Sequence, residues 1–235
     1  MNNNRTANLL NKEHIKYLFS IFEKNNAKIR LVGGCIRDAF INKENKDIDT
    51  ATIVKPNEVL EILNTNNIEY DDFAINYGSI IAYPFEKKVQ ITTLREDVNQ
   101  IGRHTNVIYT SNWEKDAARR DFTFNAMYLG SNNQLYDFYN GLEDLKENKI
   151  RFIGEIEERI KEDYLRIYRY FRFLGLFELP KIKLNDQKIV EKYIHESLAV
   201  LTNDVIRQEI LKMFNMPFPL NCFYISHQTL QKFKW

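Results

Sequence analysis

The amino-acid sequence predicts an α+β fold, in which a mixed β-sheet is followed by an all-helical region. Two strand-like segments, residues 79–83 and 89–94, follow one another without a helix between them, which indicates a mixed sheet rather than a purely parallel one. After about residue 155, turn-forming residues become rare and apolar residues recur at helical intervals. The chain of 235 residues is long enough to bury one substantial core, or one domain with a helical extension.

Helical segments are predicted from the spacing of apolar residues. Near the N-terminus, apolar residues fall at i, i+3, i+4 and i+7, as Ile15, Leu18, Phe19 and Phe22. Proline is favoured in the first turn of a helix, so Pro56 predicts the start of another helix. We expect further helices over residues 35–41, 186–200 and 204–215, and long helices in the segment after residue 155.

Strand segments are predicted from two-residue alternation. Residues 47–52 alternate polar and apolar side chains, and Val89, Ile91 and Thr93 share one face of a second strand. A short apolar strand is expected over residues 29–32. The chain is therefore divided into an N-terminal helix (1–27), a sheet domain (28–150), a helical domain (151–214) and a tail (215–235).

Composition restricts the class of protein. With 44% hydrophobic and 28% charged residues, the chain is typical of a soluble globular protein. No run approaches the roughly 18 apolar residues of a membrane span, and no signal peptide is visible, so we expect a cytoplasmic protein without a membrane partner. The cysteines, Cys35 and Cys222, are too few for a disulfide framework or a zinc site.

The distribution of charge says more than its sum. The net charge is only +1, but the field around a protein depends on where its charges lie. Arg159, Arg166, Arg169 and Arg172 are crowded into one segment. A local basic surface of this kind permits nucleic-acid binding. No protein partner can be predicted from the sequence.

One region combines residues that bind phosphates and metal ions. Gly33 and Gly34 lie between a strand and a helix, where backbone N–H groups can approach a phosphate and the helix N-terminus adds positive potential. Arg37, one helical turn later, can bind the same phosphates. Asp47 and Asp49 lie on one face of an extended strand, so both carboxylates can point at one metal ion. Mg²⁺ prefers such oxygen ligands.

Each of these motifs is more often structural when it occurs alone, as a turn or a solvated strand end. Here they occur together, and Gly-Gly-x-x-Arg-Asp with the later Asp-x-Asp-Thr-Ala-Thr resembles the first motif of the class II tRNA nucleotidyltransferases and poly(A) polymerases. Further motifs resemble those of this family and occur in its order, at residues 119–126, 137–145 and 162–173. The resemblance covers about residues 28 to 212.

The resemblance implies a fold and a reaction. It implies a nucleotidyltransferase head of the polymerase β-like type over the sheet domain, followed by a helical neck. The implied reaction is template-independent addition of C and A nucleotides to the 3′ end of tRNA or another RNA, from CTP and ATP. Asp47 and Asp49 would be the catalytic and metal-binding residues, with Mg²⁺ as the cofactor. Two metal ions would activate the RNA 3′-hydroxyl and stabilise the leaving pyrophosphate.

The resemblance also assigns a nucleotide-binding set. Its members are Gly33, Gly34, Arg37, Arg120, Asp121, Asn125, Asp163, Arg166 and Arg169. Asp163 and Arg166 are three residues apart, which makes them neighbours on one helical face. A carboxylate accepts from the exocyclic amine of cytosine or adenine and an arginine donates to ring acceptors, so this pair can select C and A. The alternative for the pair is an ordinary helix salt bridge.

The sequence departs from the family pattern at several points. Gln90 stands where the family has an acidic residue, and an amide supplies no charge to a metal site. Val205 stands where the neck motif has an arginine. The chain also stops soon after the helical domain, and residues 215–235 suggest a truncated or aberrant end without the family's body and tail domains.

These departures leave alternative functions open. One is a poly(A) polymerase, which shares the same motifs, and another is a truncated, inactive nucleotide- or RNA-binding remnant. We favour tRNA as the acceptor because the C/A-selecting pair and the segment Gly102-Arg103-His104 fit the addition of two different nucleotides. In the family this segment is part of a mobile loop that repositions the nucleotide.

Overall fold

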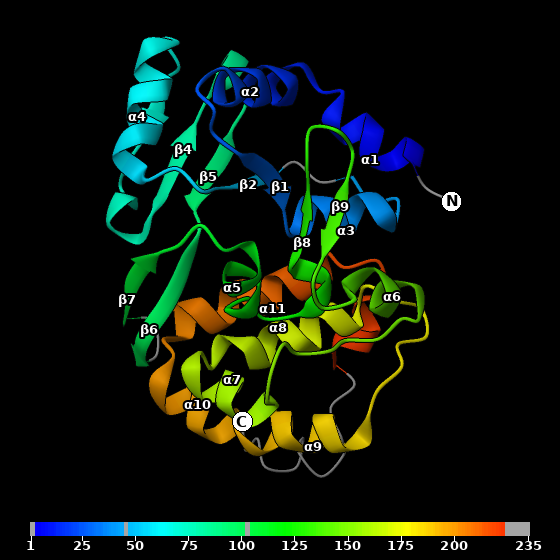
Figure 1. Ribbon diagram of the computed structural model, residues 1–235. Helices are drawn as coiled ribbons and strands as arrows, with labels where there is room; N and C mark the ends of the chain where they lie inside the picture. The colour runs from blue at the N-terminus through cyan, green and yellow to red at the C-terminus, as the bar shows by residue number, and fades with distance from the viewer. Residues whose placement is uncertain (1–2, 45–46, 102–103, 224–235) are drawn as a thin grey trace. The chain divides into compact units, whose positions relative to one another are not determined.

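A computed structural model describes residues 3–44, 47–101 and 104–223 of the chain (Figure 1). The chain divides into two compact units, which are described separately. The sheet unit comprises Met1–Val98 and Asn106–Leu142, and the helical unit comprises Asn99–Thr105 and Glu143–Trp235. The predicted α+β class is confirmed. The functional division of the chain at residues 28, 151 and 215 stays a prediction.

A seven-stranded sheet forms the centre of the sheet unit, in the order β3-β4-β5-β2-β1-β8-β9. Its strands are β1 (Ile29–Val32), β2 (Ile48–Thr52), β3 (Tyr70–Asp71), β4 (Ser79–Ala82), β5 (Val89–Thr93), β8 (Met127–Leu129) and β9 (Leu135–Asp137). β2 and β5 are parallel, whereas the other neighbouring strands are antiparallel. The predicted mixed sheet is therefore confirmed, because the short connection between β4 and β5 pairs them as antiparallel neighbours.

The helices of the sheet unit precede β1 or lie between the strands in the chain. They are α1 (Asn3–Leu10), α2 (Glu13–Lys24), α3 (Gly34–Phe40), α4 (Pro56–Thr65) and α5 (Trp113–Ala118), with short 3₁₀ helices η1 (Ile75–Tyr77), η2 (Pro84–Glu86) and η3 (Thr123–Asn125). α2, α3 and α4 pack against strands of the sheet (Figure 1). The start of α4 at its predicted proline is confirmed.

The single N-terminal helix expected within residues 1–27 is two helices. Lys12 is extended, with φ −60° and ψ 130°, and the chain turns there between α1 and α2. Glu13 begins α2, where a negative charge is favourable beside the helix N-terminus. The predicted apolar face of α2 is buried, as Ile15, Leu18, Phe19 and Phe22.

Burial along β5 follows the predicted alternation. Val89, Ile91 and Thr93 are buried, whereas Gln90 is only half-buried. Asp49 of β2 pairs with Gln90 in the parallel register. Because paired residues of neighbouring strands share a face of the sheet, Asp49 and Gln90 lie on the same face.

A two-stranded ribbon lies between β5 and β8 in the sequence. β6 (Arg95–Ile101) pairs with β7 (His104–Tyr109), and the sequence analysis predicts neither strand. Gly102 and Arg103 lie outside the described residues. The repositioning loop expected at this point therefore stays a prediction.

The helical unit contains most of the C-terminal helices. They are α7 (Ile156–Glu162), α8 (Leu165–Leu174), α9 (Leu184–Lys192), α10 (Ile194–Val200), α11 (Asn203–Phe214) and the 3₁₀ helix η4 (Pro219–Phe223), while α6 (Gly141–Lys146) begins in the sheet unit and ends in the helical unit. In the described part of the chain, no helix combines the length and the apolar character needed to cross a bilayer.

The long helices expected after residue 155 are wrong, because the helical hydrogen-bond ladder is interrupted. Asp163 is extended (φ −150°, ψ 103°) and separates α7 from α8. Its Oδ1 accepts from the backbone N–H of Leu165 at 3.0 Å, so the short polar side chain competes for a backbone donor. The helix expected over residues 186–200 is likewise divided at Tyr193.

The residues after α11 pack onto α8 as far as they are described. The Phe218 N–H donates to the Gly175 carbonyl at 3.0 Å, and Cys222 is buried beside the same glycine. A Cβ atom at position 175 would lie 2.4 Å from the Cys222 sulfur, so only glycine permits this contact. Phe218 and Phe223 remain exposed on the surface.

Candidate active site

Two carboxylates lie at the start of β2. Asp47 is exposed directly before the strand, and Asp49 is half-buried as its second residue. Burial raises the pKa of Asp49, while Arg120 acts in the opposite direction and the charge of Asp47 raises the pKa further. Arg37 and Lys88 are also near enough to lower it. The structure thus surrounds the predicted carboxylate pair with cations from three other segments.

The turn after β1 has the backbone conformation that the paired glycines predict. Gly33 has φ 77° and ψ −128°, a region that side chains rarely adopt, and Gly34 begins α3. A Cβ atom on Gly33 would lie 3.5 Å from the Asn125 carbonyl oxygen and 3.8 Å from Arg120 Nη1. The glycine turn therefore lies against two other predicted nucleotide-binding residues.

Arg37, Asn125 and Asp121 form one buried network. Arg37 Nη1 donates to Asn125 Oδ1 at 2.7 Å, and Asn125 Nδ2 donates to Asp121 Oδ1 at 3.0 Å. Arg37 is also paired with Asp38 at 2.7 Å. All four side chains are buried. The fold brings these predicted residues together from α3 and from the segment around η3, and it holds their orientations by charge-assisted hydrogen bonds.

Asp116 and Tyr128 hold Arg120 in place, and the sequence analysis did not predict a role for either. Asp116 is fully buried in α5 and pairs with Arg120 at 3.1 Å and with Arg119 at 2.8 Å. Burial opposes its charged form, but these two arginines and the hydroxyl of Tyr128 (2.6 Å) bring its pKa below the usual range. The spacing of Asp116 from the two arginines, at i+3 and i+4, is the signal that could have identified it.

A cation–π stack packs α5 against the sheet. The Arg30 guanidinium lies between the rings of Trp113, at 3.9 Å, and Tyr136, at 3.4 Å. Trp113 also contacts the Tyr128 ring edge-on, with centroids 5.3 Å apart. Because Trp113 is the first residue of α5, the stack fixes the helix that carries Asp116.

The side chain of Gln90, which the sequence analysis singled out, is held beside the carboxylate pair. Its Nε2 donates to Ser79 Oγ at 3.0 Å, and the residue pairs with Asp49 across β2 and β5. An amide at this place can offer a metal ion an oxygen but no negative charge. The departure from the family pattern therefore lies at the predicted metal site itself.

The donor set fits a magnesium ion rather than a fully protein-bound metal. Among the described residues, no group of three or more His, Cys, Asp or Glu side chains is arranged to hold a metal ion. Asp47 and Asp49, the predicted ligands, offer two carboxylates at the start of β2. Mg²⁺ is commonly bound by one or two carboxylates, with water and substrate phosphates in its other positions.

In the helical unit, the expected geometry of Asp163 and Arg166 is wrong. The two residues do not share a helical face, because Asp163 is extended before the first turn of α8. Arg166 is buried and its Nη1 donates to Glu162 Oε2 at 2.7 Å and to the Arg159 carbonyl at 2.8 Å. Arg169 is half-buried, with its guanidinium over the Phe173 ring. The assigned role of these residues in base binding stays a prediction.

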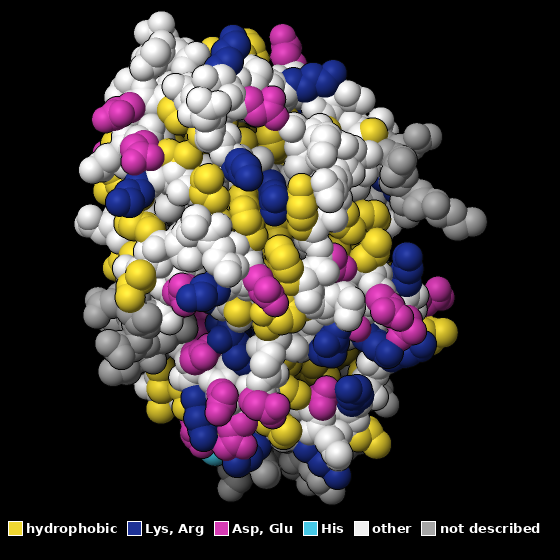
Figure 2. All heavy atoms as spheres, in the orientation of Figure 1, with side chains coloured by type: hydrophobic (Ala, Val, Ile, Leu, Met, Phe, Trp, Pro, Cys, Tyr) yellow, Lys and Arg dark blue, Asp and Glu magenta, His cyan; other side chains and the backbone are white. Residues whose placement is uncertain are grey.

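The crowded arginines of this segment are largely neutralised. Arg159 and Arg166 pair with Glu162, and Arg172 pairs with the buried Glu209 at 2.8 Å. On the face shown in Figure 2, Lys and Arg side chains are interspersed with Asp and Glu over the helices of this unit. The local basic surface suggested by the arginine spacing is therefore largely offset by carboxylates.

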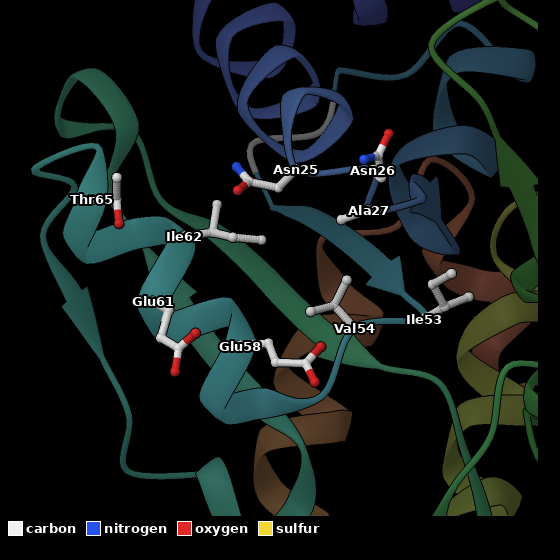
Figure 3. A pocket seen from close by; sticks show the side chains of 9 residues that line it. All are labelled: Asn25, Asn26, Ala27, Ile53, Val54, Glu58, Glu61, Ile62 and Thr65. Carbon is white, nitrogen blue, oxygen red and sulfur yellow. The ribbon is translucent and has the colours of Figure 1, made fainter.

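A hollow of about 420 Å³ lies at the other end of β1 and β2 from the carboxylate pair (Figure 3). It lies between the end of α2, the start of β1, the end of β2 and α4. Its lining residues are Asn25, Asn26, Ala27, Ile53, Val54, Glu58, Glu61, Ile62 and Thr65. None of these residues belongs to the predicted site. The candidate active site is therefore located at the carboxylates and the arginine network, and not at this hollow.

Solved structures share this fold. The Bacillus stearothermophilus CCA-adding enzyme in complex with CTP superposes with a TM-score of 0.80, at 22% identity, over 94% of this chain and 56% of that one. The Thermotoga maritima CCA-adding enzyme complexed with tRNA gives a TM-score of 0.71, at 25% identity, over 94% of this chain and 50% of that one. The mixed sheet followed by helices is thus the architecture of the CCA-adding enzymes.

The sequence comparisons define the family. Residues 29–151 match the family described as the poly A polymerase head domain. The chain is 44% identical over 164 residues to human mitochondrial CCA tRNA nucleotidyltransferase 1, covering 69% of this chain and 38% of that protein. It is 32% identical over 200 residues to the CCA-adding enzyme of Lactobacillus helveticus, covering 84% of this chain and 49% of the relative. The chain belongs to the poly(A) polymerase head-domain family, and it spans half or less of the length of these relatives.

Proposed function

We propose that this chain is a template-independent RNA nucleotidyltransferase that adds C and A nucleotides to the 3′ end of tRNA, from CTP and ATP. The observation that carries the proposal is the position of the Asp47–Asp49 pair, next to Arg37 and Arg120 in a fold shared with CCA-adding enzymes. The relatives named for CCA addition supply the acceptor and the two nucleotides.

In this proposal, Asp47 and Asp49 hold Mg²⁺. When bound, the ion supplies positive charge that favours attack by the RNA 3′-hydroxyl and departure of pyrophosphate. The protein's own contribution is to hold both carboxylates on one face of β2 and to surround Asp49 with cations. Since burial raises the pKa of Asp49, the nearby arginines help to keep it ionised at neutral pH.

Arg37 and Arg120 bind the triphosphate in the proposed enzyme. Both guanidinium groups are held by buried carboxylates, Asp38 and Asp116, so little side-chain entropy is lost when an anion binds. Asp121 accepts from a ribose hydroxyl, which favours ribonucleotides. This network is fixed before substrate arrives, as electrostatic stabilisation requires.

We further propose that Asp163, Arg166 and Arg169 contact the nucleotide base. Asp163 stands in the extended break before α8, where a carboxylate can accept from the exocyclic amine of cytosine or adenine. The hydrogen bond to Glu162 orients the Arg166 guanidinium, which donates to acceptor atoms of the base in this proposal. Neither interaction requires the two residues to share a helical face.

Addition of A nucleotides alone is the second candidate function. It is favoured by the description of the matched family as the poly A polymerase head domain. Gln90 beside Asp49 favours the third possibility, a nucleotide- or RNA-binding protein without catalysis. A cytoplasmic location also stays a proposal, since the human relative is named as mitochondrial.

One experiment separates these functions. The protein is incubated with Mg²⁺, each labelled nucleotide in turn, and tRNA transcripts that end before, within and after CCA. A CCA-adding enzyme incorporates C and then A and stops, whereas a poly(A) polymerase adds A to every transcript. Asp49→Asn, which keeps the shape of the half-buried side chain, is expected to lower the rate at least about 100-fold. Incorporation by the wild-type protein that Asp49→Asn leaves intact would contradict the assigned site.

A further inference from the structure

A second hollow in the sheet unit carries a concentration of positive charge. It has a volume of about 320 Å³ and lies between α1, the start of α2, α3 and the segment that follows α3. Figure 1 shows α1 alongside α3, and the two helices are in contact. Arg5, Lys12 and Lys43 line this hollow, and Glu44 is the acidic residue in its lining. We call it the basic hollow.

The three cations of the basic hollow differ from the arginines of the active site. Within the described residues of the sheet unit, Arg37 and Arg120 each pair with a buried aspartate, whereas no salt bridge joins Arg5, Lys12 or Lys43 to a carboxylate. Together with Glu44, the three cations give the lining of the hollow an excess of positive charge. The arrangement becomes favourable when an anion binds between them.

The volume of the basic hollow is sufficient for a phosphate group. A water molecule occupies about 30 Å³, so the volume accommodates a phosphate with several waters. Arg5 already donates from Nη1 to the Phe40 carbonyl at 3.0 Å, which fixes its guanidinium at the C-terminal end of α3. The amide side chains of Asn8 and Asn42 offer further donors.

The basic hollow lies close to the active site along the chain. Lys43 precedes Asp47 by four residues, so their Cα atoms are at most about 14 Å apart. The Lys43 N–H donates to the carbonyl of Asp38 at 2.8 Å, and the Asp38 carboxylate holds Arg37. In each strand of a duplex, phosphates recur about every 3.4 Å of helix axis, so a strand that ends at Asp47 reaches the hollow within a few nucleotides.

We propose that the basic hollow binds a backbone phosphate of the RNA whose 3′ end is extended. The proposal rests on the proposed function for the nature of the ligand and assigns Arg5, Lys12 and Lys43 to RNA binding. A free nucleotide is a different ligand, which Arg37 and Arg120 bind. Loss of the hollow therefore weakens the binding of RNA and leaves the binding of CTP unchanged.

The test compares two variants that lose the same charge. Arg5→Gln/Lys12→Gln/Lys43→Gln removes the basic hollow, and Lys24→Gln/Lys28→Gln/Lys55→Gln removes three exposed lysines at the opposite end of β1 and β2. Binding of a tRNA transcript that lacks CCA is measured by fluorescence anisotropy over a range of salt concentrations. The hollow variant is expected to bind about tenfold more weakly, with a log–log salt slope that is shallower by about 1. The control variant should change neither quantity appreciably.

A second variant and a second readout keep the result interpretable. Lys12→Gln/Lys43→Gln retains the bond from Arg5 to α3 and should also weaken RNA binding and make the salt slope shallower. Equal losses in the hollow and control variants, or no loss in either hollow variant, would overturn the proposal. Nucleotide addition is assayed in parallel. If the hollow variants keep the wild-type KM for RNA, RNA binding by the hollow is refuted, but the proposed nucleotidyltransferase activity is not. If RNA binding depends on salt but no nucleotide is added, only the proposed nucleotidyltransferase activity is refuted.

Discussion

Arg37 and Asn125 lie 88 positions apart in the sequence and are joined by a buried hydrogen bond of 2.7 Å. The Asn125 amide uses its oxygen toward Arg37 and its nitrogen toward Asp121, so one side chain orients both a cation and an anion. We therefore expect Asn125 to be a positioning residue for the nucleotide site, in addition to any contact that it makes with the ribose.

Substitution of Asn125 tests this relationship. Asn125→Leu removes a donor and an acceptor from a buried network and is expected to destabilise the protein by about 1–3 kcal/mol. It should also raise the KM for CTP, because Arg37 and Asp121 lose their common partner. A double-mutant cycle with Arg37→Ala measures the coupling through CTP affinity. Strictly additive losses of affinity would show that the bond does not orient Arg37 for the nucleotide.

Gln90 lies opposite Asp49 in the sheet, and a carboxylate there would face the metal site. Gln90→Glu is expected to lower the Mg²⁺ concentration needed for half-maximal activity, because a third acid adds charge for the ion. Without Mg²⁺ the same change should raise the pKa of Asp49, since like charges disfavour ionisation.

The glutamate also loses the donor that binds Ser79, and this effect is controlled separately. Ser79→Ala breaks the same hydrogen bond without adding charge and should leave the Mg²⁺ requirement unchanged. An identical Mg²⁺ titration for the wild type and Gln90→Glu would mean that position 90 does not act on the metal.

Asp116 should make the stability of the protein depend on pH. The fold lowers the pKa of Asp116 below its value of about 3.9 in the unfolded protein. The ionised carboxylate therefore stabilises the folded protein above about pH 3.9, and this stabilisation is lost as the pH falls toward the pKa of Asp116 in the folded protein. Asp116→Asn leaves Arg119 and Arg120 without their buried carboxylate. We expect a loss of about 3 kcal/mol in the free energy of unfolding at pH 7.

Urea denaturation of the wild type and Asp116→Asn between pH 7 and pH 3 measures this difference. The gap between the two proteins should be widest near neutrality and should narrow below about pH 4. Glu114→Gln, at an exposed position of the same helix, is the matched control and should alter stability little at either pH. A gap that stays constant across the range would refute the role of the Asp116 charge.

Asp163 combines a local structural contact with its proposed contact to the base. Its Oδ1 accepts from the Leu165 N–H, which is the contact of a helix-capping residue. Asp163→Ala should therefore lose about 1 kcal/mol of stability as well as base selectivity. Asp163→Ser keeps a capping oxygen but lacks the longer carboxylate, so it should keep stability and lose selectivity alone.

Competition among the four nucleotides for incorporation into an RNA primer measures the selectivity of these variants. If Asp163→Ser prefers CTP and ATP as strongly as the wild type does, the residue only caps α8. The thermal midpoint of each variant, measured alongside, shows whether the cap has been retained.

The sequence by itself determined the features that depend on the spacing of apolar side chains along a strand or a helix. The alternation of Val89, Ile91 and Thr93 predicts the buried face of β5, and the confirmed apolar face of α2 follows from helical spacing. Asp47 and Asp49 are two residues apart, which predicts one shared face where the segment is extended. The paired glycines predicted a turn between a strand and a helix, and Gly33 adopts positive φ there, which glycine does without a steric penalty.

Only the tertiary structure decided which distant side chains meet. The hydrogen bonds from Arg37 to Asn125 and from Arg120 to the Tyr128 hydroxyl depend on how η3 and β8 pack. The periodicity of the local sequence does not predict this packing. The separation of Asp163 from the helix of Arg166 also escaped the sequence, because apolar spacing continues across a break. Side-chain periodicity reports the face that a segment buries, whereas hydrogen bonds between segments depend on the completed fold.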